Sequence, residues 1–118
     1  MVVDYLQLLK ATPGVRERRH QVEEISKGLK QLAHQYDVPV LALSSLARPA
    51  NDGPPSLASL RESGELEHDA DVVLLLHRDK DDTAGRTELS IAKARDGRLG
   101  EIHLFFHGDM QTFVEAVI

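Results

Sequence analysis

The chain contains no cysteine, which excludes disulfide bonds and thiolate metal sites. It also lacks an apolar run long enough to cross a membrane, since the longest, Val72–Leu76, suits a buried strand. No basic segment followed by a long apolar stretch opens the sequence at Met1–Leu9, so no secretory signal is expected. These absences favour a cytoplasmic protein with no membrane partner.

Positive charge is in deficit, with 14 Lys and Arg against 19 Asp and Glu and a net charge of −5. This balance counts against non-specific nucleic-acid binding by the chain alone, because such binding depends on neutralising phosphates. Cations are nevertheless grouped locally, and such a group can serve as a basic edge in a larger assembly. The two groups are Arg16, Arg18 and Arg19, and Lys93, Arg95 and Arg98.

Strand and helix signals alternate through the first half of the chain. A short apolar strand, Val2–Val3, ends at Asp4, and apolar residues at helical spacing predict an amphipathic helix over Arg16–Tyr36. The continuous apolar run Val38–Leu43 predicts a strand buried on both faces. The apolar face of the helix consists of Val22, Ile25, Leu29, Leu32, Ala33 and Tyr36.

The second half predicts a short helix over Leu57–Leu66, broken near Gly64, and a buried strand over Asp71–His77. Two more strands follow, joined around Asp96-Gly97, which is a strong hairpin signal. These strands are Thr87–Ala94 and Gly100–His107, and Phe113–Val117 adds a last one. Loops are expected over Ala11–Arg16, Arg48–Ser56 and Arg78–Arg86.

This order predicts an α/β fold in a single domain of 118 residues. Early strand–helix alternation favours a mostly parallel sheet with flanking helices, and the C-terminal hairpin favours an antiparallel extension at one edge.

Polar residues follow the first two predicted strands. Asp4 lies at the carboxyl end of the first strand. Phosphate-handling enzymes place a carboxylate beside Mg²⁺ at such a position. Ser45 and Arg48 after the second could contact a terminal phosphate, because such strand ends face the ligand crevice of an open α/β sheet. The alternatives are a polar strand end at Asp4 and serines, Ser44 and Ser45, that satisfy backbone groups.

Two further segments carry candidate anion-binding residues. In the first, Arg61 supplies a guanidinium and Gly64 allows close backbone approach to a phosphate, unless the segment is a solvated helix end with a glycine cap. In the second, Lys93 and Arg95 lie two apart on a predicted strand, so both project from the same face at the hairpin. A rigidly mounted arginine near the nucleotide of a neighbouring subunit is what an arginine finger requires. The alternative is charge that protects a sheet edge from aggregation. The histidines form no metal-ligand pattern.

Taken together, these segments resemble the C-terminal half of the RecA-like motor domain of DnaB-type replicative DNA helicases. The fold implied is a partial RecA-like P-loop NTPase core. The matching segments are Val3–Leu8, Val38–Ser44, Leu60–Asp71 and Ile91–Gly97.

The resemblance implies a role for each matching residue. Asp4 corresponds to the Walker B aspartate that holds the Mg²⁺ shell, and Lys93 and Arg95 reach the nucleotide of the adjacent subunit, with Arg95 as the finger. Single-stranded DNA is contacted by a central loop. Its members here are Arg61, Glu62 and Gly64.

Two departures from the family pattern matter. Ser45 stands where the family usually has a glutamine that senses the γ-phosphate, and a serine reaches less far. No G-x-x-x-x-G-K-[ST] segment is present, and the family's catalytic glutamate lies upstream of the matched region. The family uses ATP and Mg²⁺, but neither is expected to bind tightly to this chain alone.

The expected function is therefore part of a replicative helicase motor that does not hydrolyse ATP by itself. Expected partners are single-stranded DNA, bound weakly, and further copies, as a hexamer in the family or a dimer for this chain. The alternative is a non-catalytic helicase-like interaction module that self-associates or caps a helicase subunit. A degenerate gene remnant is a third possibility.

Overall fold

The computed structural model describes residues 1–47, 53–60 and 64–117. Their contacts divide into two compact units. The first unit is residues 1–47 with 57–70, and the second unit is residues 48–56 with 71–118. The expectation of one domain over 1–118 stays a prediction.

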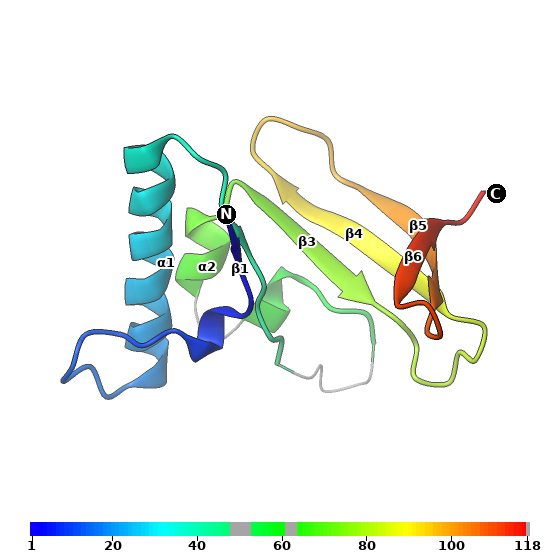
Figure 1. The fold of residues 1–118 in the computed structure, drawn as a ribbon, viewed down its shortest axis with the longest axis horizontal. Coiled ribbons are helices and arrows are strands. Elements are labelled where there is room, and N and C mark those ends of the chain that lie inside the picture. Colours follow the sequence, from blue (N-terminus) through cyan, green and yellow to red (C-terminus); the bar gives the residue numbers. More distant parts are fainter. Residues whose placement is uncertain (48–52, 61–63, 118) are drawn as a thin grey trace. The chain divides into compact units, whose positions relative to one another are not determined.

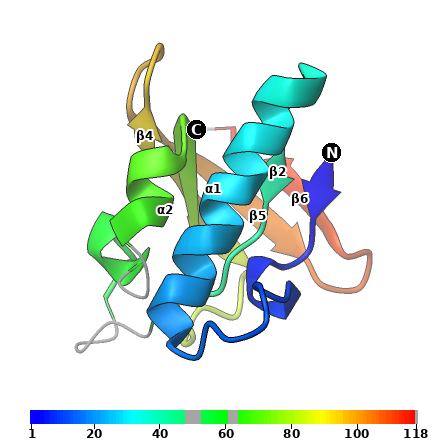
Figure 2. The same cartoon turned by 90° about the vertical axis from the view of Figure 1, so that its left-hand side faces the viewer.

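The first unit is a β-α-β arrangement followed by two short helical segments (Figure 1). Its strands β1 and β2 run parallel, with Val2 opposite Leu41 and Val3 opposite Ala42. Figure 2 shows α1 and α2 side by side. The elements are β1 (Val2–Val3), a 3₁₀ turn η1 (Leu6–Leu8), α1 (Arg18–Tyr36), β2 (Leu41–Ala42), η2 (Leu57–Leu60) and α2 (Gly64–Asp69).

Helix α1 forms because its apolar residues recur at the 3.6-residue period, which turns one stripe toward the core. Val22 and Ile25 are buried with Leu6 of η1, and Leu29 and Leu66 pack against them. The predicted helix is confirmed, beginning two residues later than expected. Tyr36, which was expected on the apolar face, is instead 64% exposed at the last turn.

Strand β2 is shorter and more exposed than the apolar run Val38–Leu43 predicts. The strand covers Leu41–Ala42, and the side chains of Leu41 and Leu43 are 54% and 44% exposed. The expectation of burial on both faces is wrong for this chain. An apolar run shows which residues would gain from burial, but it does not supply the element that covers them.

The second unit is an antiparallel sheet whose strands follow one another in chain order, as Figure 1 shows. The predicted strands and hairpin are confirmed, and the connection between β4 and β5 is the loop over 95–99 that contains Asp96 and Gly97. In β3 burial alternates, with Val73 and Leu75 buried, so the expectation of a strand buried throughout is wrong. The strands are β3 (Val72–His77), β4 (Arg86–Ala94), β5 (Gly100–His107) and β6 (Thr112–Glu115).

Gly85 fastens the β3–β4 connection onto β5. Its φ is +77°, and a Cβ added there would collide with the backbone oxygen of Phe106. The carbonyl of Gly85 accepts hydrogen bonds from the N–H of Phe106 at 2.8 Å and from the hydroxyl of buried Thr87 at 3.1 Å. This position needs glycine both because its φ is positive and because a Cβ would collide with Phe106.

The α/β class is confirmed. Among the described strands, one pairing is parallel and three are antiparallel, where the sequence predicts a mostly parallel sheet. The predicted helix Leu57–Leu66 is divided into η2 and α2, and Gly64 begins the second of these instead of ending the first.

Candidate functional site

The carboxyl ends of β1 and β2 lie together, as expected for a parallel pair. The N–H of Leu43 donates to the carbonyl of Val3 at 2.9 Å, and the N–H of Leu6 donates to the carbonyl of Leu43 at 2.8 Å. Asp4 lies between these two contacts and is exposed. The predicted Mg²⁺ aspartate therefore stands at the strand edge from which Ser44 and Ser45 also emerge.

Gln7 connects the two strand ends through its side chain. Its Nε2 donates to Ser44 Oγ at 2.9 Å, and its Oε1 accepts from the N–H of Ser45 at 3.2 Å. The hydroxyl of Ser44 donates to the carbonyl of Ser45 at 3.1 Å, so this serine does satisfy a backbone group. Ser45 is exposed and Ser44 is half-buried. These hydrogen bonds of the Gln7 side chain hold the predicted phosphate-sensing segment against the residues that follow Asp4.

A small pocket of about 60 Å³ lies beside the Gln7 side chain. Gln7, Ser44 and Ser45 line its polar side, and Leu66 of α2 lies on its apolar side. A pocket of this size has room for water molecules, and its polar lining offers them hydrogen-bond partners.

Asp4 provides a carboxylate for a cation at this edge. Within residues 1–47, 53–60 and 64–117, no group of three or more acidic, histidine or cysteine side chains could hold a metal ion. Mg²⁺ commonly takes one or two carboxylates and completes its octahedron with waters and substrate phosphates. The donor set fits a Mg²⁺ held through its water shell, and it does not fit a metal caged by protein ligands.

The predicted DNA-contacting loop lies largely outside the described residues. Arg61 and Glu62 fall there, as does Arg48 of the predicted phosphate-contacting group. Gly64 is described, and it is the exposed first residue of α2. An added Cβ there would meet nothing within 4 Å and φ is not positive, so neither crowding nor backbone strain requires glycine.

Helix α2 is fastened to α1 by a part-buried polar contact. The hydroxyl of Ser26, which is 6% exposed, donates to Asp69 Oδ2 at 2.7 Å. This hydrogen bond fixes geometry, because breaking it leaves the buried hydroxyl of Ser26 unpaired. The helix that follows the loop of Arg61 is therefore anchored at its far end.

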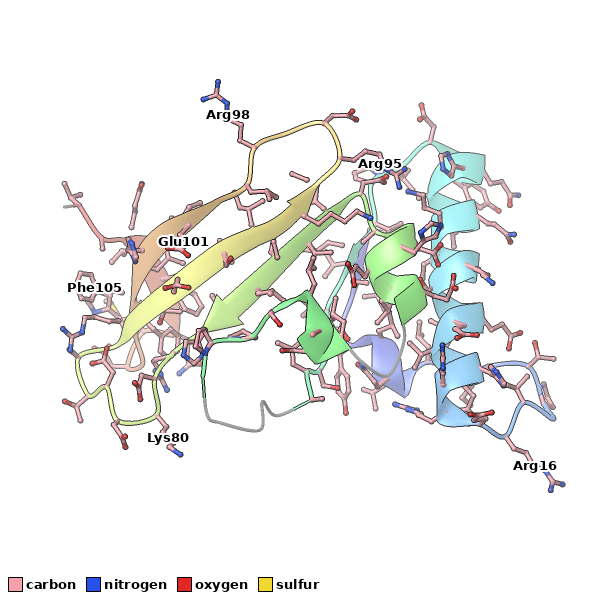
Figure 3. All side chains as sticks on the ribbon, turned by 180° about the vertical axis from the view of Figure 1, so that it is seen from behind. Arg16, Lys80, Arg95, Arg98, Glu101 and Phe105 are labelled. Carbon is pink, nitrogen blue, oxygen red and sulfur yellow. The ribbon has the colours of Figure 1, made fainter. Side chains whose placement is uncertain are left out.

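In the second unit, Lys93 and Arg95 do not lie on one strand as predicted. Lys93 is in β4 opposite Val73, whereas β4 ends at Ala94 and Arg95 begins the loop to β5. Pairing of Ala94 with Val72 ends the ladder there. Figure 3 shows Arg98 projecting from the same loop.

Arg95 is held at its backbone and at its side chain by one residue. Its N–H donates to the carbonyl of Asp71 at 2.8 Å, and its Nη1 lies 2.9 Å from Asp71 Oδ1. The two side chains are 51% and 57% exposed. An ion pair this exposed is weak, so the guanidinium is oriented but readily exchanged onto another anion.

The basic group Arg16, Arg18 and Arg19, at the start of α1, is partly engaged with the first unit itself. Arg18 Nη2 donates to the carbonyl of Gln7 at 3.2 Å, and Arg19 pairs with Glu23 at 3.1 Å. Arg16 projects from the loop before the helix in Figure 3.

Sequence reasoning missed Gln7, which contacts candidate residues in the first unit, and Asp71, which contacts Arg95 in the second. Gln7 lies inside the matching segment Val3–Leu8, but its partners are 37 and 38 positions away. A local pattern carries no signal for a contact over that separation.

The model of the DnaB-like helicase C-terminal domain family matches residues 1–115. The chain belongs to this family. The replicative DNA helicase DnaB of Treponema pallidum (strain Nichols) is 45% identical over 112 residues, covering 95% of this chain and 25% of the relative. The counterpart in Geobacillus stearothermophilus is 42% identical over 123 residues, covering 97% of this chain and 27% of the relative.

Solved structures agree with the family. A DnaB-like replicative helicase, described with its interactions with primase, superimposes with a TM-score of 0.89 at 40% identity, covering 98% of this chain and 30% of that one. The expectation of a partial RecA-like core is thereby confirmed. This DnaB-like chain spans about a quarter of the length of the curated relatives it matches. No helix in the described part is both long and apolar enough to cross a membrane.

Proposed function

We propose that this chain is the second part of the ATP-driven motor of a cytoplasmic replicative DNA helicase and works with a P-loop held elsewhere. The observation that carries the proposal is the shared strand edge in the first unit. Asp4 stands there beside Ser44 and Ser45, and the Gln7 side chain holds the two strand ends together. Polar groups at the carboxyl ends of parallel strands are where open α/β sheets bind ligands.

Each candidate residue then has one task. Asp4 holds the water shell of a Mg²⁺ that neutralises nucleotide phosphates, and Ser45, with Arg48, responds to the terminal phosphate. Lys93 and Arg95 act on the nucleotide of a neighbouring copy, with Arg95 stabilising the charge that develops in phosphoryl transfer. The DNA-facing segment comprises Arg61, Glu62 and Gly64, of which Gly64 begins α2.

The chain by itself should not hydrolyse ATP. P-loop N–H groups and the P-loop lysine supply most contacts to the β- and γ-phosphates. Several charge-assisted hydrogen bonds of roughly 1.5–3 kcal/mol each are missing without them. An aspartate that contacts Mg²⁺ through water cannot replace that sum. Isothermal titration of the chain with Mg-ATP should therefore give no binding in the micromolar range, and a micromolar Kd would contradict the proposal.

The positive test supplies the P-loop. This chain replaces its counterpart in the Geobacillus stearothermophilus helicase, and ATPase activity is measured on the purified chimera. Arg95→Ala should lower kcat by about 10³-fold or more, since a finger acts on the transition state. Arg98→Ala is the matched control, because it removes the same charge from the same loop. A chimera that tolerates Arg95→Ala as well as Arg98→Ala would overturn the assignment.

Single-stranded DNA binding tests the loop. One copy gains no avidity from a ring, so the chain alone should bind an oligonucleotide weakly and with strong salt dependence. Arg61→Ala should remove that binding, whereas Arg16→Ala, at an exposed position in another part of the first unit, should leave it nearly unchanged.

A second candidate function is association without catalysis. Val2, Leu41 and Leu43 are exposed by 66%, 54% and 44% on β1, β2 and the residue after β2, and exposed apolar strands tend to pair with another chain. A stable dimer that ignores both ATP and DNA would favour this role. Hexamers, measured by light scattering, would favour the motor.

A further inference from the structure

Gln7 uses both ends of its side-chain amide in hydrogen bonds to the segment after β2. Its amide donates to a side chain through Nε2 (2.9 Å to Ser44 Oγ) and accepts from a backbone through Oε1 (3.2 Å from the N–H of Ser45). A side-chain amide carries the same donor and acceptor as a peptide group. Gln7 therefore joins the segment after β1 to the segment after β2, beside the backbone hydrogen bond from Leu6 to Leu43.

The backbone beneath this side chain is itself fixed. Gln7 sits in η1 between Leu6, which is 1% exposed in the core, and Leu8. Its carbonyl accepts from Arg18 Nη2 at 3.2 Å, and the preceding N–H, that of Leu6, is bonded to Leu43. The amide is thus mounted on a rigid base, and it transmits that rigidity to the segment it contacts.

The rigid position of the Ser45 backbone matters because residue 45 is a serine, whose side chain is short. A serine hydroxyl reaches only a short way beyond its own backbone, so its distance to a phosphate is set by where the backbone lies. Gln7 holds that backbone by the N–H of Ser45 itself. Gln7 in turn lies three residues after Asp4, so the same side chain links Ser45 to the segment that follows Asp4.

We propose that Gln7 is a positioning residue that couples the Ser44–Ser45 phosphate-sensing segment to the strand of the Mg²⁺ aspartate. The assignment rests on the proposed function and adds to it a route by which a short sensor can work. A change at the terminal phosphate that moves Ser45 is passed through the amide to η1 and Asp4, and from there to the rest of the motor.

The test uses the chimera that supplies the P-loop, with ATPase measured with and without single-stranded DNA. Gln7→Leu keeps the size of the side chain and removes both hydrogen bonds. Gln35→Leu is the matched control, since Gln35 is an exposed glutamine of α1 in the same unit. Gln7→Glu is the conservative variant, because a carboxylate still accepts from the N–H of Ser45 and from a rotated Ser44 hydroxyl.

Gln7→Leu should lower the ratio of DNA-stimulated to basal ATPase by at least about fivefold, the lower end of typical coupling between sites. The KM for Mg-ATP should change by less than about twofold, because ground-state binding stays with the P-loop. Gln7→Glu should recover most of the ratio, and Gln35→Leu should leave it unchanged. Ser44→Ala, which removes one of the two contacts, should give an intermediate loss.

A purely structural role makes a different prediction. Loss of folded protein lowers basal and stimulated rates together, so an unchanged ratio in Gln7→Leu would overturn the proposal, whatever the total activity. If Gln7→Leu fails to fold, the ratio in Ser44→Ala decides in the same way. An unmodified chimera without DNA-stimulated ATPase would overturn the proposed function and this assignment together, which separates that failure from one confined to Gln7.

Discussion

In the first unit the candidate groups stand at the ends of two-residue strands. In the second, Lys93 lies near the end of a nine-residue strand within a four-stranded sheet, and Arg95 follows that strand. A ladder of two residues leaves few backbone hydrogen bonds to fix what comes after it. The first unit makes up the difference with a side chain, Gln7. The second unit places Arg95 largely through backbone pairing, with Asp71 added at the surface.

This difference indicates which substitutions should disturb the candidate residues of each unit. Side-chain substitutions should disturb the strand ends of the first unit, because side chains and a small core hold them. The second unit should yield mainly to changes that the backbone cannot accommodate. Each of the following experiments can break or sharpen that contrast.

The largest effect is expected for Gly85→Ala in the second unit. Alanine is strained at a φ of +77° and its Cβ would collide with the backbone oxygen of Phe106. We expect a loss of roughly 2–4 kcal/mol in the free energy of unfolding, measured by urea denaturation.

Gly97→Ala is the control for Gly85→Ala. Its added Cβ would lie 3.4 Å from that of Ala94, which is ordinary contact, so the loss should stay below about 1 kcal/mol. Equal losses in the two variants would show that backbone geometry at Gly85 does not govern the second unit.

The contrast also separates what a sequence can predict from what it cannot. Helix α1 was predictable because the period of Val22, Ile25 and Leu29 is local, and so was the hairpin, because Asp96-Gly97 is a local turn signal. Exposure was not predictable. The runs at Leu41 and Val72 are apolar on both faces, and burial depends on what packs over them.

The candidate site divides in the same way. Asp4 and Ser45 were placed at one edge by the rule that parallel strands end together, and the structure has their strand ends side by side. The contacts of Gln7 and Asp71 join segments far apart in the chain, and no periodicity encodes them. The roles of Lys93, Arg95 and the loop of Arg61 rest on family resemblance and stay predictions.

A smaller effect is expected for Val22→Ala in the first unit. Val22 is 1% exposed, and truncating it should cost roughly 2 kcal/mol in transfer and cavity terms. Hydrogen exchange by mass spectrometry should show faster exchange in α1 with little change in β4 and β5. Val2→Ala, at a 66% exposed position, is the control and should cost less than about 0.5 kcal/mol. Equal acceleration in both units would mean that they do not open separately.

Asp71→Asn should have less effect on stability still. It removes the charge that faces Arg95, and a pair whose side chains are 51% and 57% exposed contributes about 0–1 kcal/mol. The backbone hydrogen bond from Arg95 to the carbonyl of Asp71 remains, so the loop should keep its place. Urea denaturation at low and high salt measures the difference from wild type, which should shrink as salt rises. Asp96→Asn removes the same charge from the position next to Arg95. An equally salt-sensitive loss of stability in that variant would show that the effect comes from overall charge and not from the Asp71–Arg95 contact.

The smallest effect concerns Asp82 in the β3–β4 connection. Its carboxylate accepts from the N–H of Ala84 at 2.7 Å and from Arg86 Nε at 3.0 Å, and these contacts lower the pKa of Asp82 below its usual value of 3.8. Because the native pKa is the lower one, the stabilising contribution of Asp82 is fully present above the usual value. It is lost as the pH falls through the native pKa. The amide signals of Ala84 and Arg86, followed by NMR from about pH 6 to pH 2, should therefore move only in the most acidic part of the range. Asp82→Asn should abolish that step and Asp96→Asn should not. A midpoint above the usual value would show that the connection is not held by this carboxylate.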